Sequence, residues 1–546
     1  MPWLAIALLA ICCPARPCRA QIEENAPVTP EEQERNALAL KPAPVILSPG
    51  PQYAGSARIF QGIPGIERAL NGRLWAVWYG GGPGEGPDNY CMLVTSADDG
   101  ATWSDLKLVI DPPGNIRAFD PCLWMDPDGR LWLFYAQGYS LWDGRAGVWA
   151  IVTEQPGDEN PEWSAPRRLC DGIMMNKPTV LTSGAWLLPA AIWAFDPIII
   201  DEAYAHDIAG TTGSWVVAST DRGATWTPLG RSDVDERQCD EHMVVERQDG
   251  SLWMLVRTKY GIGESVSTDG GKTWGPGRRT NLPHFEAAAR FFIRRLSSGK
   301  LLLVCHHPPS GNARSYLTAF LSGDDGKTWQ GGLLLDERKY VSYPDGVQSP
   351  DGTIYIIYDF ERHGAKQILM ATFTEEDVAA GKCVSDRARL RVLVNQATGV
   401  KRLDMSKVTL KDNADGAPLL TAASPDIEPA DGELDTFRQG AKLFLNRAYT
   451  VRDKVEGFDG LRFVRASIDH AEVVCRSAGV VFVLTPLPDR NKDSVIEELL
   501  GQGFEKAAVS ESLLFGEIEG NICSIFQKRV EAGETVRFGK WGVLLY

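Results

Sequence analysis

The eight residues Ser96–Trp103, which read SADDGATW, follow a pattern, S-x-D-x-G-x-T-W, that the chain repeats three more times. The other copies are Ser219–Trp226, Ser267–Trp274 and Ser322–Trp329, at spacings of 123, 48 and 55 residues. Each copy follows a strand-like run, and its residues suit a tight turn. Asp bonds back to turn amides, Gly supplies a positive φ and Trp packs as the next strand begins. We therefore predict a structural rather than a catalytic role for these aspartates.

A repeat of about 50 residues built from short strands is typical of a β-propeller, in which each blade is a four-stranded sheet. The gap of 123 residues is close to two periods, and strand-like Trp149–Thr153 followed by Trp163 fills it as a degenerate copy. A last unit ends at Ile368–Thr372. The predicted fold is all-β, a six-bladed β-propeller with a C-terminal β-rich, sandwich-like module.

Tryptophan usage indicates the domain boundaries. Sixteen of the 17 Trp precede residue 330, and the chain turns polar and rich in Ala, Asp and Pro near residues 405–435. Such a composition is typical of a linker. We predict a propeller over 45–400, a linker over 401–435 and an accessory β-rich domain over 436–546, with one helix near Ser494–Leu500.

The N-terminus predicts the compartment. Residues 3–13 form an apolar run that is too short to span a bilayer and fits the central region of a secretory signal over 1–20. We expect a secreted or periplasmic protein, with a lipoprotein anchor at Cys12 or Cys13 as the alternative. No later segment is long and apolar enough to cross a membrane.

The amino-acid composition and net charge of the chain exclude several classes of function. The 546 residues are 44% hydrophobic and 23% charged, which is ordinary for a globular protein. The net charge of −15, without basic runs, excludes nucleic acid as a partner. The eight Cys beyond the signal form no C-x-x-C pair, and His306 and His307 would face opposite sides of a strand. The sequence therefore predicts no metal site and no cofactor, and it leaves the disulfide pairing and the oligomeric state open.

Three further motifs carry candidate chemistry. Glu241 stands sixteen residues before Arg257, Arg314 stands eight before a box serine, and Tyr343 stands eight before an Asp-Gly turn. With the box repeats, these spacings resemble those of the sialidase (neuraminidase) superfamily over about residues 54–375. That resemblance implies an exo-acting glycoside hydrolase that removes a terminal sialic acid with retention, through a tyrosyl intermediate.

The resemblance also implies residue roles that physical chemistry explains. A sialic acid has a carboxylate on its anomeric carbon, and the guanidiniums of Arg257 and Arg314 would bind it through paired, charge-assisted hydrogen bonds. A neutral nucleophile, Tyr343, avoids repulsion by that carboxylate. Because a phenol is a weak nucleophile, Glu241 would accept its proton.

The acid is expected on a loop between the first motif and the first box. Asp88 is our choice for this general acid, and Glu85 is its rival. Asp120 is expected to line the substrate cleft.

The sequence departs from the family in the segment RIFQGIP, residues 58–64. Members of the family have Phe-Arg-Ile-Pro here, and Gly62 stands at the position of their arginine. We expect Gln61 to donate one replacement hydrogen bond, and Arg58, Arg68 or Lys177 to supply the missing charge.

Two other functions fit the same motifs. One is hydrolysis of a different terminal sugar on the same scaffold, and the other is glycan binding without catalysis. The expected partners in every case are sialylated or other acidic glycans. Joint retention of Glu241 and Tyr343 favours catalysis, because a pure binder needs no activated nucleophile.

Overall fold

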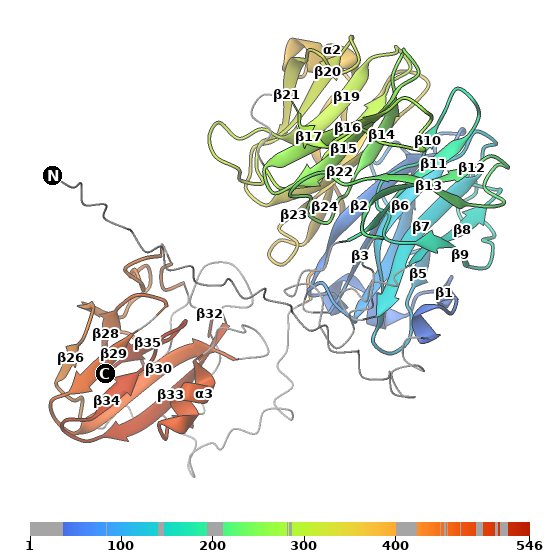
Figure 1. Ribbon diagram of the computed structural model, residues 1–546. Helices are drawn as coiled ribbons and strands as arrows, with labels where there is room; N and C mark the ends of the chain where they lie inside the picture. The colour runs from blue at the N-terminus through green and yellow to red at the C-terminus, as the bar shows by residue number, and fades with distance from the viewer. Residues whose placement is uncertain are drawn as a thin grey trace, which may run out of the picture.

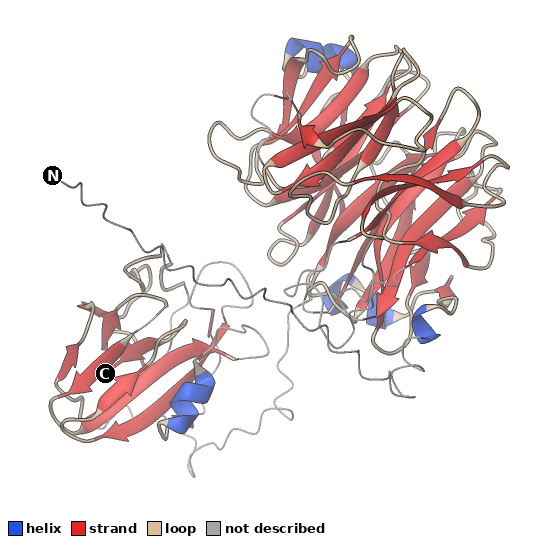
Figure 2. Cartoon of the chain, viewed as in Figure 1, coloured by secondary structure: helices blue, strands red, loops and turns tan. Residues whose placement is uncertain are grey.

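The computed structural model describes residues 37–546 except for 83, 140–146, 194–210, 281, 283–286 and 400–422. In the C-terminal part it also omits 448, 453–454, 456, 470, 488–494, 508–511 and 514–521. The predicted signal segment and most of the predicted linker therefore lie outside the described residues. Figures 1 and 2 show a chain built almost wholly of strands with a few short helical segments.

Six antiparallel sheets follow one another along the chain, each with its strands in sequence order, which confirms the predicted six-bladed propeller. Blade 1 contains β2 (Gln61–Arg68), β3 (Leu74–Gly81), β4 (Asn89–Ser96) and β5 (Leu108–Ile110), with β1 (Val45–Ile46) added at its outer edge beside β5. Blade 2 contains β6 (Ile116–Met125), β7 (Leu131–Tyr139), β8 (Gly147–Thr153) and β9 (Arg167–Asp171). Blade 3 contains β10 (Thr179–Val180), β11 (Trp186–Ile192), β12 (Gly213–Ser219) and β13 (Thr227–Ser232).

The remaining blades have the same order. Blade 4 contains β14 (Met243–Glu246), β15 (Leu252–Thr258), β16 (Gly261–Ser267) and β17 (Arg278–Arg279). Blade 5 contains β18 (Phe292–Arg295), β19 (Leu301–His306), β20 (Leu317–Ser322) and β21 (Gln330–Asp336). Blade 6 contains β22 (Val341–Gln348), β23 (Ile354–Phe360), β24 (Gln367–Phe373) and β25 (Arg389–Gln396). Short helical segments are η1 (Pro51–Tyr53), η2 (Gly55–Ala57) and α2 (Glu375–Ala380).

The first strand of each blade faces the axis, and the ring closes between blades 6 and 1. In Figure 1, β22 and β23 lie beside β2, and the residue contacts agree. The Ile66 amide of β2 donates to Asp345 Oδ2 of β22 at 2.9 Å, and the Ile63 amide donates to Asp359 Oδ2 at 2.8 Å.

The repeated box forms the turn between the third and fourth strands of a blade, as predicted. In the first copy, Asp98 accepts hydrogen bonds from the Thr102 amide at 2.9 Å and from Ser96 Oγ at 2.7 Å. Gly100 has a φ of 77°, and the other three copies repeat this geometry. Trp163 of the degenerate copy packs edge-on against Trp75 of the preceding blade at 6.3 Å. The box is thus a local turn whose side chains also join adjacent blades.

A buried charged cluster occupies the axis. Lys177 Nζ lies 3.2 Å from Glu67 Oε2 and 3.3 Å from Asp345 Oδ2, and it donates to the carbonyls of Ile66 and Leu123 at 2.6 Å each. These partners come from blades 1, 2 and 6, and the Lys177 side chain is 3% exposed. The cluster ties the innermost strands together.

Residues 423–546 form a sandwich-like module, as predicted. One sheet has the order β26-β29-β34 and the other β27-β28-β35-β30-β33-β31, with β32 paired to β33. The strands are β26 (Ile427–Pro429), β27 (Glu433–Thr436), β28 (Arg462–Arg465), β29 (Glu472–Cys475), β30 (Gly479–Pro486), β31 (Glu505–Lys506), β32 (Ser512–Leu513), β33 (Ile522–Val530), β34 (Thr535–Arg537) and β35 (Val543–Leu545). Buried residues of both sheets, such as Val473 and Val483, share one core.

The module differs from its predicted start at residue 436. β26 and β27 already belong to its sheets, but both are edge strands with polar, partly exposed side chains. Edge strands tolerate such residues, so their composition resembles a linker. The predicted helix near Ser494–Leu500 is confirmed as α3 (Ile496–Gly501).

Eight cysteines lie in the described residues, and all eight are free thiols. None of the helices in the described ranges is long and apolar enough to cross a membrane.

Candidate functional site

Three of the innermost strands each contain a β-bulge, and in each bulge one residue directly precedes a proline. Ile63, Asp120 and Tyr343 have positive φ values of 56°, 48° and 55°, and the strand register shifts at each of them. Proline cannot donate to the ladder and is tolerated at a bulge, which redirects the neighbouring side chain. The three bulges lie towards the N-terminal ends of β2, β6 and β22. They therefore place Asp120 and Tyr343 towards the same end of the propeller axis.

Hairpin register explains the sixteen-residue spacing. In the β14–β15 pair Met243 lies opposite Leu255, so two residues further on Glu241 lies opposite Arg257. The Arg257 amide donates to the Asp240 carbonyl at 2.8 Å, and Arg257 Nη1 donates to Glu241 Oε1 at 2.5 Å. Both side chains are buried, and Glu241 Oε2 has no hydrogen-bond partner among the described residues.

Tyr343 joins this pair across the ring. Its hydroxyl donates to Glu241 Oε1 at 3.2 Å, and Arg257 Nη1 lies 3.5 Å from the same hydroxyl oxygen. Burial raises the pKa of the Tyr343 phenol to about 12, and the negative charge of Glu241 adds to the rise. The phenol is therefore neutral at pH 7 and hydrogen-bonded to the carboxylate that would take its proton.

Two more guanidiniums flank the Tyr343 ring. The Cζ atom of Arg314 lies 5.5 Å from the ring centroid, and that of Arg362 lies 5.1 Å from it. Arg314 Nη2 donates to the Ala288 carbonyl at 3.0 Å, which fixes its side chain. The structure thus brings together the predicted Glu241, Arg257, Arg314 and Tyr343, and it adds Arg362.

Sequence reasoning missed Arg362, which lies in the turn between β23 and β24. A Cβ atom at Gly62 would collide with the Arg362 side chain, at 2.5 Å from its Cγ. Arg362 Nη1 donates to Glu85 Oε1 at 2.7 Å, and the Arg362 carbonyl accepts from the Gln61 amide at 3.3 Å. The signal in the sequence was the glycine itself, whose missing side chain leaves the space that Arg362 fills.

The three carboxyl groups predicted for the site, those of Asp120, Glu85 and Asp88, differ in burial and in the charges around them. Asp120 is 3% exposed, and burial raises its pKa to about 7, with the charges of Glu85 and Glu241 adding to the rise. Desolvation opposes ionisation of Glu85, yet the positive charge of Arg362 lowers its pKa.

Asp88, the predicted acid, is exposed and makes no side-chain hydrogen bond or ion pair with any described residue. Burial raises the pKa of Asp111, and the Asp88 charge adds to that rise. The exposed Asp88 carboxylate is therefore close enough to Asp111 for their charges to interact.

The residues expected to replace the missing arginine have other partners. Gln61 Nε2 donates to the Lys366 carbonyl at 2.7 Å, and Arg58 Nε donates to Gln61 Oε1 at 3.0 Å. Arg68 lies 3.7 Å from Asp99 in the first box turn. With Lys177 held in the axial cluster, all four are used to support the fold.

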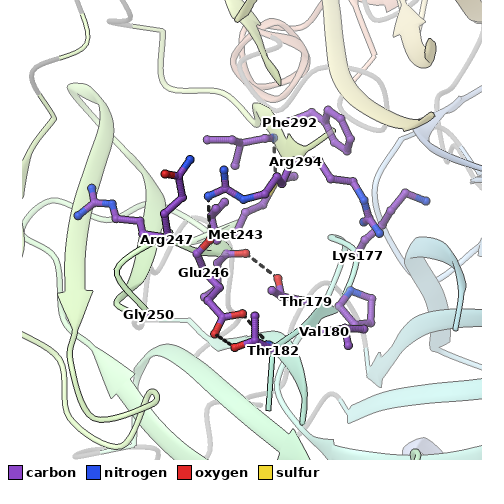
Figure 3. A pocket seen from close by; sticks show the side chains of 16 residues that line it. Lys177, Thr179, Val180, Thr182, Met243, Glu246, Arg247, Gly250, Phe292 and Arg294 are labelled. Atoms are coloured by element: carbon purple, nitrogen blue, oxygen red, sulfur yellow. Dashed lines mark hydrogen bonds between the residues drawn. The ribbon is translucent and has the colours of Figure 1, made fainter. Parts of the chain in front are cut away.

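A cavity of about 510 Å³ lies elsewhere in the propeller. Figure 3 shows this cavity with Lys177 on one side and Arg247 on the other. Its walls include the turn after β14, at the end of that strand away from Glu241. Within the described ranges, no group of three or more His, Cys, Asp or Glu is arranged to hold a metal ion.

The chain is similar to one family model and to several known proteins. Residues 72–356 match the family model described as a BNR repeat-like domain. A sialidase of Bacteroides fragilis (strain YCH46) is 24% identical over 298 residues, covering 49% of this chain and 53% of the relative. A sialidase of Micromonospora viridifaciens is 26% identical over 329 residues, covering 54% and 49%. The chain thus matches about half the length of these curated relatives.

Solved structures with a related fold include the Hadza microbial sialidase Hz136. It has a TM-score of 0.47 and 18% identity, and the match covers 58% of this chain and 66% of that one. The intramolecular trans-sialidase from Ruminococcus gnavus has a TM-score of 0.44 and 15% identity, with 59% and 95% covered. Since the family model spans more than half of its residues, this chain belongs to the BNR repeat-like family within the sialidase superfamily.

Proposed function

We propose that this protein is an exported, retaining exo-α-sialidase that removes terminal sialic acid from glycoconjugates. The observation that carries the proposal is the hydrogen bond from the Tyr343 hydroxyl to Glu241 at 3.2 Å, surrounded by guanidiniums. A neutral phenol, a buried proton acceptor and cations for a carboxylate are what this reaction needs. Export rests on the apolar run at residues 3–13.

The reaction would run in two steps. The Tyr343 oxygen attacks the anomeric carbon and passes its proton to Glu241, while the bond to the leaving oxygen breaks and that oxygen takes a proton from an acid. Water then gives a proton to the ionised acid and attacks the anomeric carbon. Glu241 returns its proton to the departing Tyr343 oxygen, so the enzyme is regenerated and the configuration is retained overall. Arg257 and Arg314 would hold the substrate carboxylate throughout.

We assign the acid to Asp120 in place of Asp88. A pKa of about 7 keeps much of Asp120 protonated at neutral pH, which is the state a general acid requires. Glu85, whose pKa Arg362 lowers, is ionised there.

The test is release of free sugar from α2,3- and α2,6-sialylated oligosaccharides by the parent protein and by Tyr343→Phe. The variant keeps the ring and removes the hydroxyl, so turnover should be lost while the melting temperature stays nearly unchanged. Normal turnover by Tyr343→Phe would contradict the tyrosyl mechanism. No release by a folded parent would contradict the sialidase activity itself.

A further inference from the structure

The position of the missing arginine is occupied by another arginine that comes from the opposite end of the propeller sequence. We infer that Arg362 supplies the third guanidinium of the carboxylate site, in place of a side chain at Gly62. This inference rests on the proposed function and deepens it, because it names how this chain recognises an acidic sugar.

A side chain at position 62 and the Arg362 side chain would occupy the same space. A Cβ atom built on Gly62 would overlap the Arg362 side chain, at 2.5 Å from its Cγ and 2.9 Å from Asp359 Oδ2. Real Cβ atoms do not approach other heavy atoms so closely, so a side chain at 62 and the present Arg362 exclude each other. The Arg362 methylenes pass through the space in which a side chain at 62 would begin, and its guanidinium lies beyond that space.

The Arg362 guanidinium lies against the Tyr343 ring. Its Cζ lies 5.1 Å from the Tyr343 ring centroid, as close as that of Arg314 at 5.5 Å. Arg257 approaches the same phenol from the Glu241 side. Three guanidiniums therefore surround one phenol, although the strand position at 62 provides none.

Hydrogen bonds hold Arg362 in place, and some of its N–H donors have no partner among the described residues. Its carbonyl is bonded to the Gln61 amide, and Tyr340 joins the neighbouring loops by accepting from the Glu361 amide and donating to the Arg314 carbonyl. Arg362 Nη1 donates to Glu85. Its Nε and Nη2 make no hydrogen bond to the described residues, which leaves one edge of the fork for a ligand carboxylate.

The experiment compares binding of free N-acetylneuraminic acid with binding of its methyl ester, by calorimetry, so that the result does not depend on turnover. The parent should prefer the acid. Arg362→Ala should weaken binding of the acid by roughly 10- to 100-fold and leave ester binding nearly unchanged, because only the acid offers a charged partner. Arg222→Ala, whose side chain is 77% exposed on a box turn, is the matched control and should behave as the parent.

A swap variant tests the shared position. Gly62→Arg alone should lower the melting temperature, because two side chains would compete for one space. Gly62→Arg combined with Arg362→Gly should restore both the melting temperature and the preference for the acid. If Arg362→Ala keeps the full preference, or if a folded swap variant discriminates no better than Arg362→Ala, the inference is overturned.

The outcomes separate this inference from the proposed function. A parent that prefers the acid and depends on Arg362, yet hydrolyses no sialoside, supports the inference and contradicts the hydrolase. A parent that hydrolyses sialosides through Tyr343 while Arg362→Ala binds normally supports the hydrolase and contradicts the inference. A folded parent that binds acid and ester equally contradicts the inference, and the release of free sugar then decides the hydrolase separately.

Discussion

Several residues of the proposed site have unusual backbone conformations. Tyr343, Asp120 and Glu241 all have φ values between 42° and 55°, a region that side-chain-bearing residues rarely occupy. Such strain persists only where the surrounding structure over-determines it, and here bulged strands and buried hydrogen bonds do so. These backbone conformations place the three side chains towards one end of the propeller axis.

At the same scale, Asp120→Asn should separate acid catalysis from binding. The amide cannot donate a proton as an acid does, so kcat on a sialylated oligosaccharide should fall by about 10²- to 10⁴-fold. An aryl sialoside with a nitrophenolate leaving group needs little protonation and should lose much less. Equal losses on the two substrates would contradict the assignment.

The pH profile gives a second readout for Asp120. Since its pKa is about 7, the parent should lose kcat as the pH rises through 7 and the acid ionises. With the aryl substrate that alkaline loss should be small. Retention of the full rate on oligosaccharides at pH 9 would exclude Asp120 as the acid.

The elements of the propeller are joined by side chains that cross between blades. His306 at the end of β19 donates from Nε2 to the Val341 carbonyl of β22 at 2.8 Å. Burial lowers the pKa of His306 to about 4, so the ring is neutral in the folded protein near pH 5. His306 thus contributes a contact between blades 5 and 6.

This contact predicts acid sensitivity. Between pH 6.5 and 4 the unfolded chain binds a proton at residue 306 that the folded chain does not, so stability falls as the pH falls. The loss amounts to at most about 3 kcal/mol. His306→Gln can still donate but does not titrate. Its free energy of unfolding in urea should therefore drop less than that of the parent between pH 7 and 4.5, and equal drops would contradict this account.

The whole ring depends on the closure of blade 6 on blade 1 and on the charges at the axis. A side chain at Gly100 in the first box would collide with Met370 of β24, and Tyr355 of β23 donates to Asp99 Oδ1 at 3.0 Å. The Lys177 cluster joins the same blades near the axis. Closure therefore relies on close packing at the outer turn and on buried ion pairs at the centre.

Removal of the axial cation should weaken the entire propeller. Lys177→Met would leave Glu67 buried without its cation, which costs about 3–5 kcal/mol. Among the described residues, Asp345 would keep only Arg290 Nη2 as a cation, at 3.6 Å from its Oδ1. Calorimetry should show a lower melting temperature for the propeller, and Lys177→Met combined with Glu67→Gln should recover part of it. An unchanged melting temperature in Lys177→Met would show that the cluster adds nothing to closure.

The sequence by itself determined the features that depend on local geometry. The box turns follow from hydrogen bonds within eight residues, and their repetition determined the blades and the six-bladed ring. Glu241 and Arg257 could be paired because a hairpin returns sixteen residues later to the same level.

Only the tertiary structure decided what closes the site. Arg362 meets Gly62 because blade 6 packs against blade 1, a contact between residues 300 positions apart that no spacing rule encodes. Asp120 has a raised pKa because folding buries it beside other carboxylates, and this burial is why we propose Asp120 as the acid in place of the exposed Asp88. Local hydrogen bonding and strand register can be read along the chain, whereas burial and long-range side-chain packing exist only once the ring has closed.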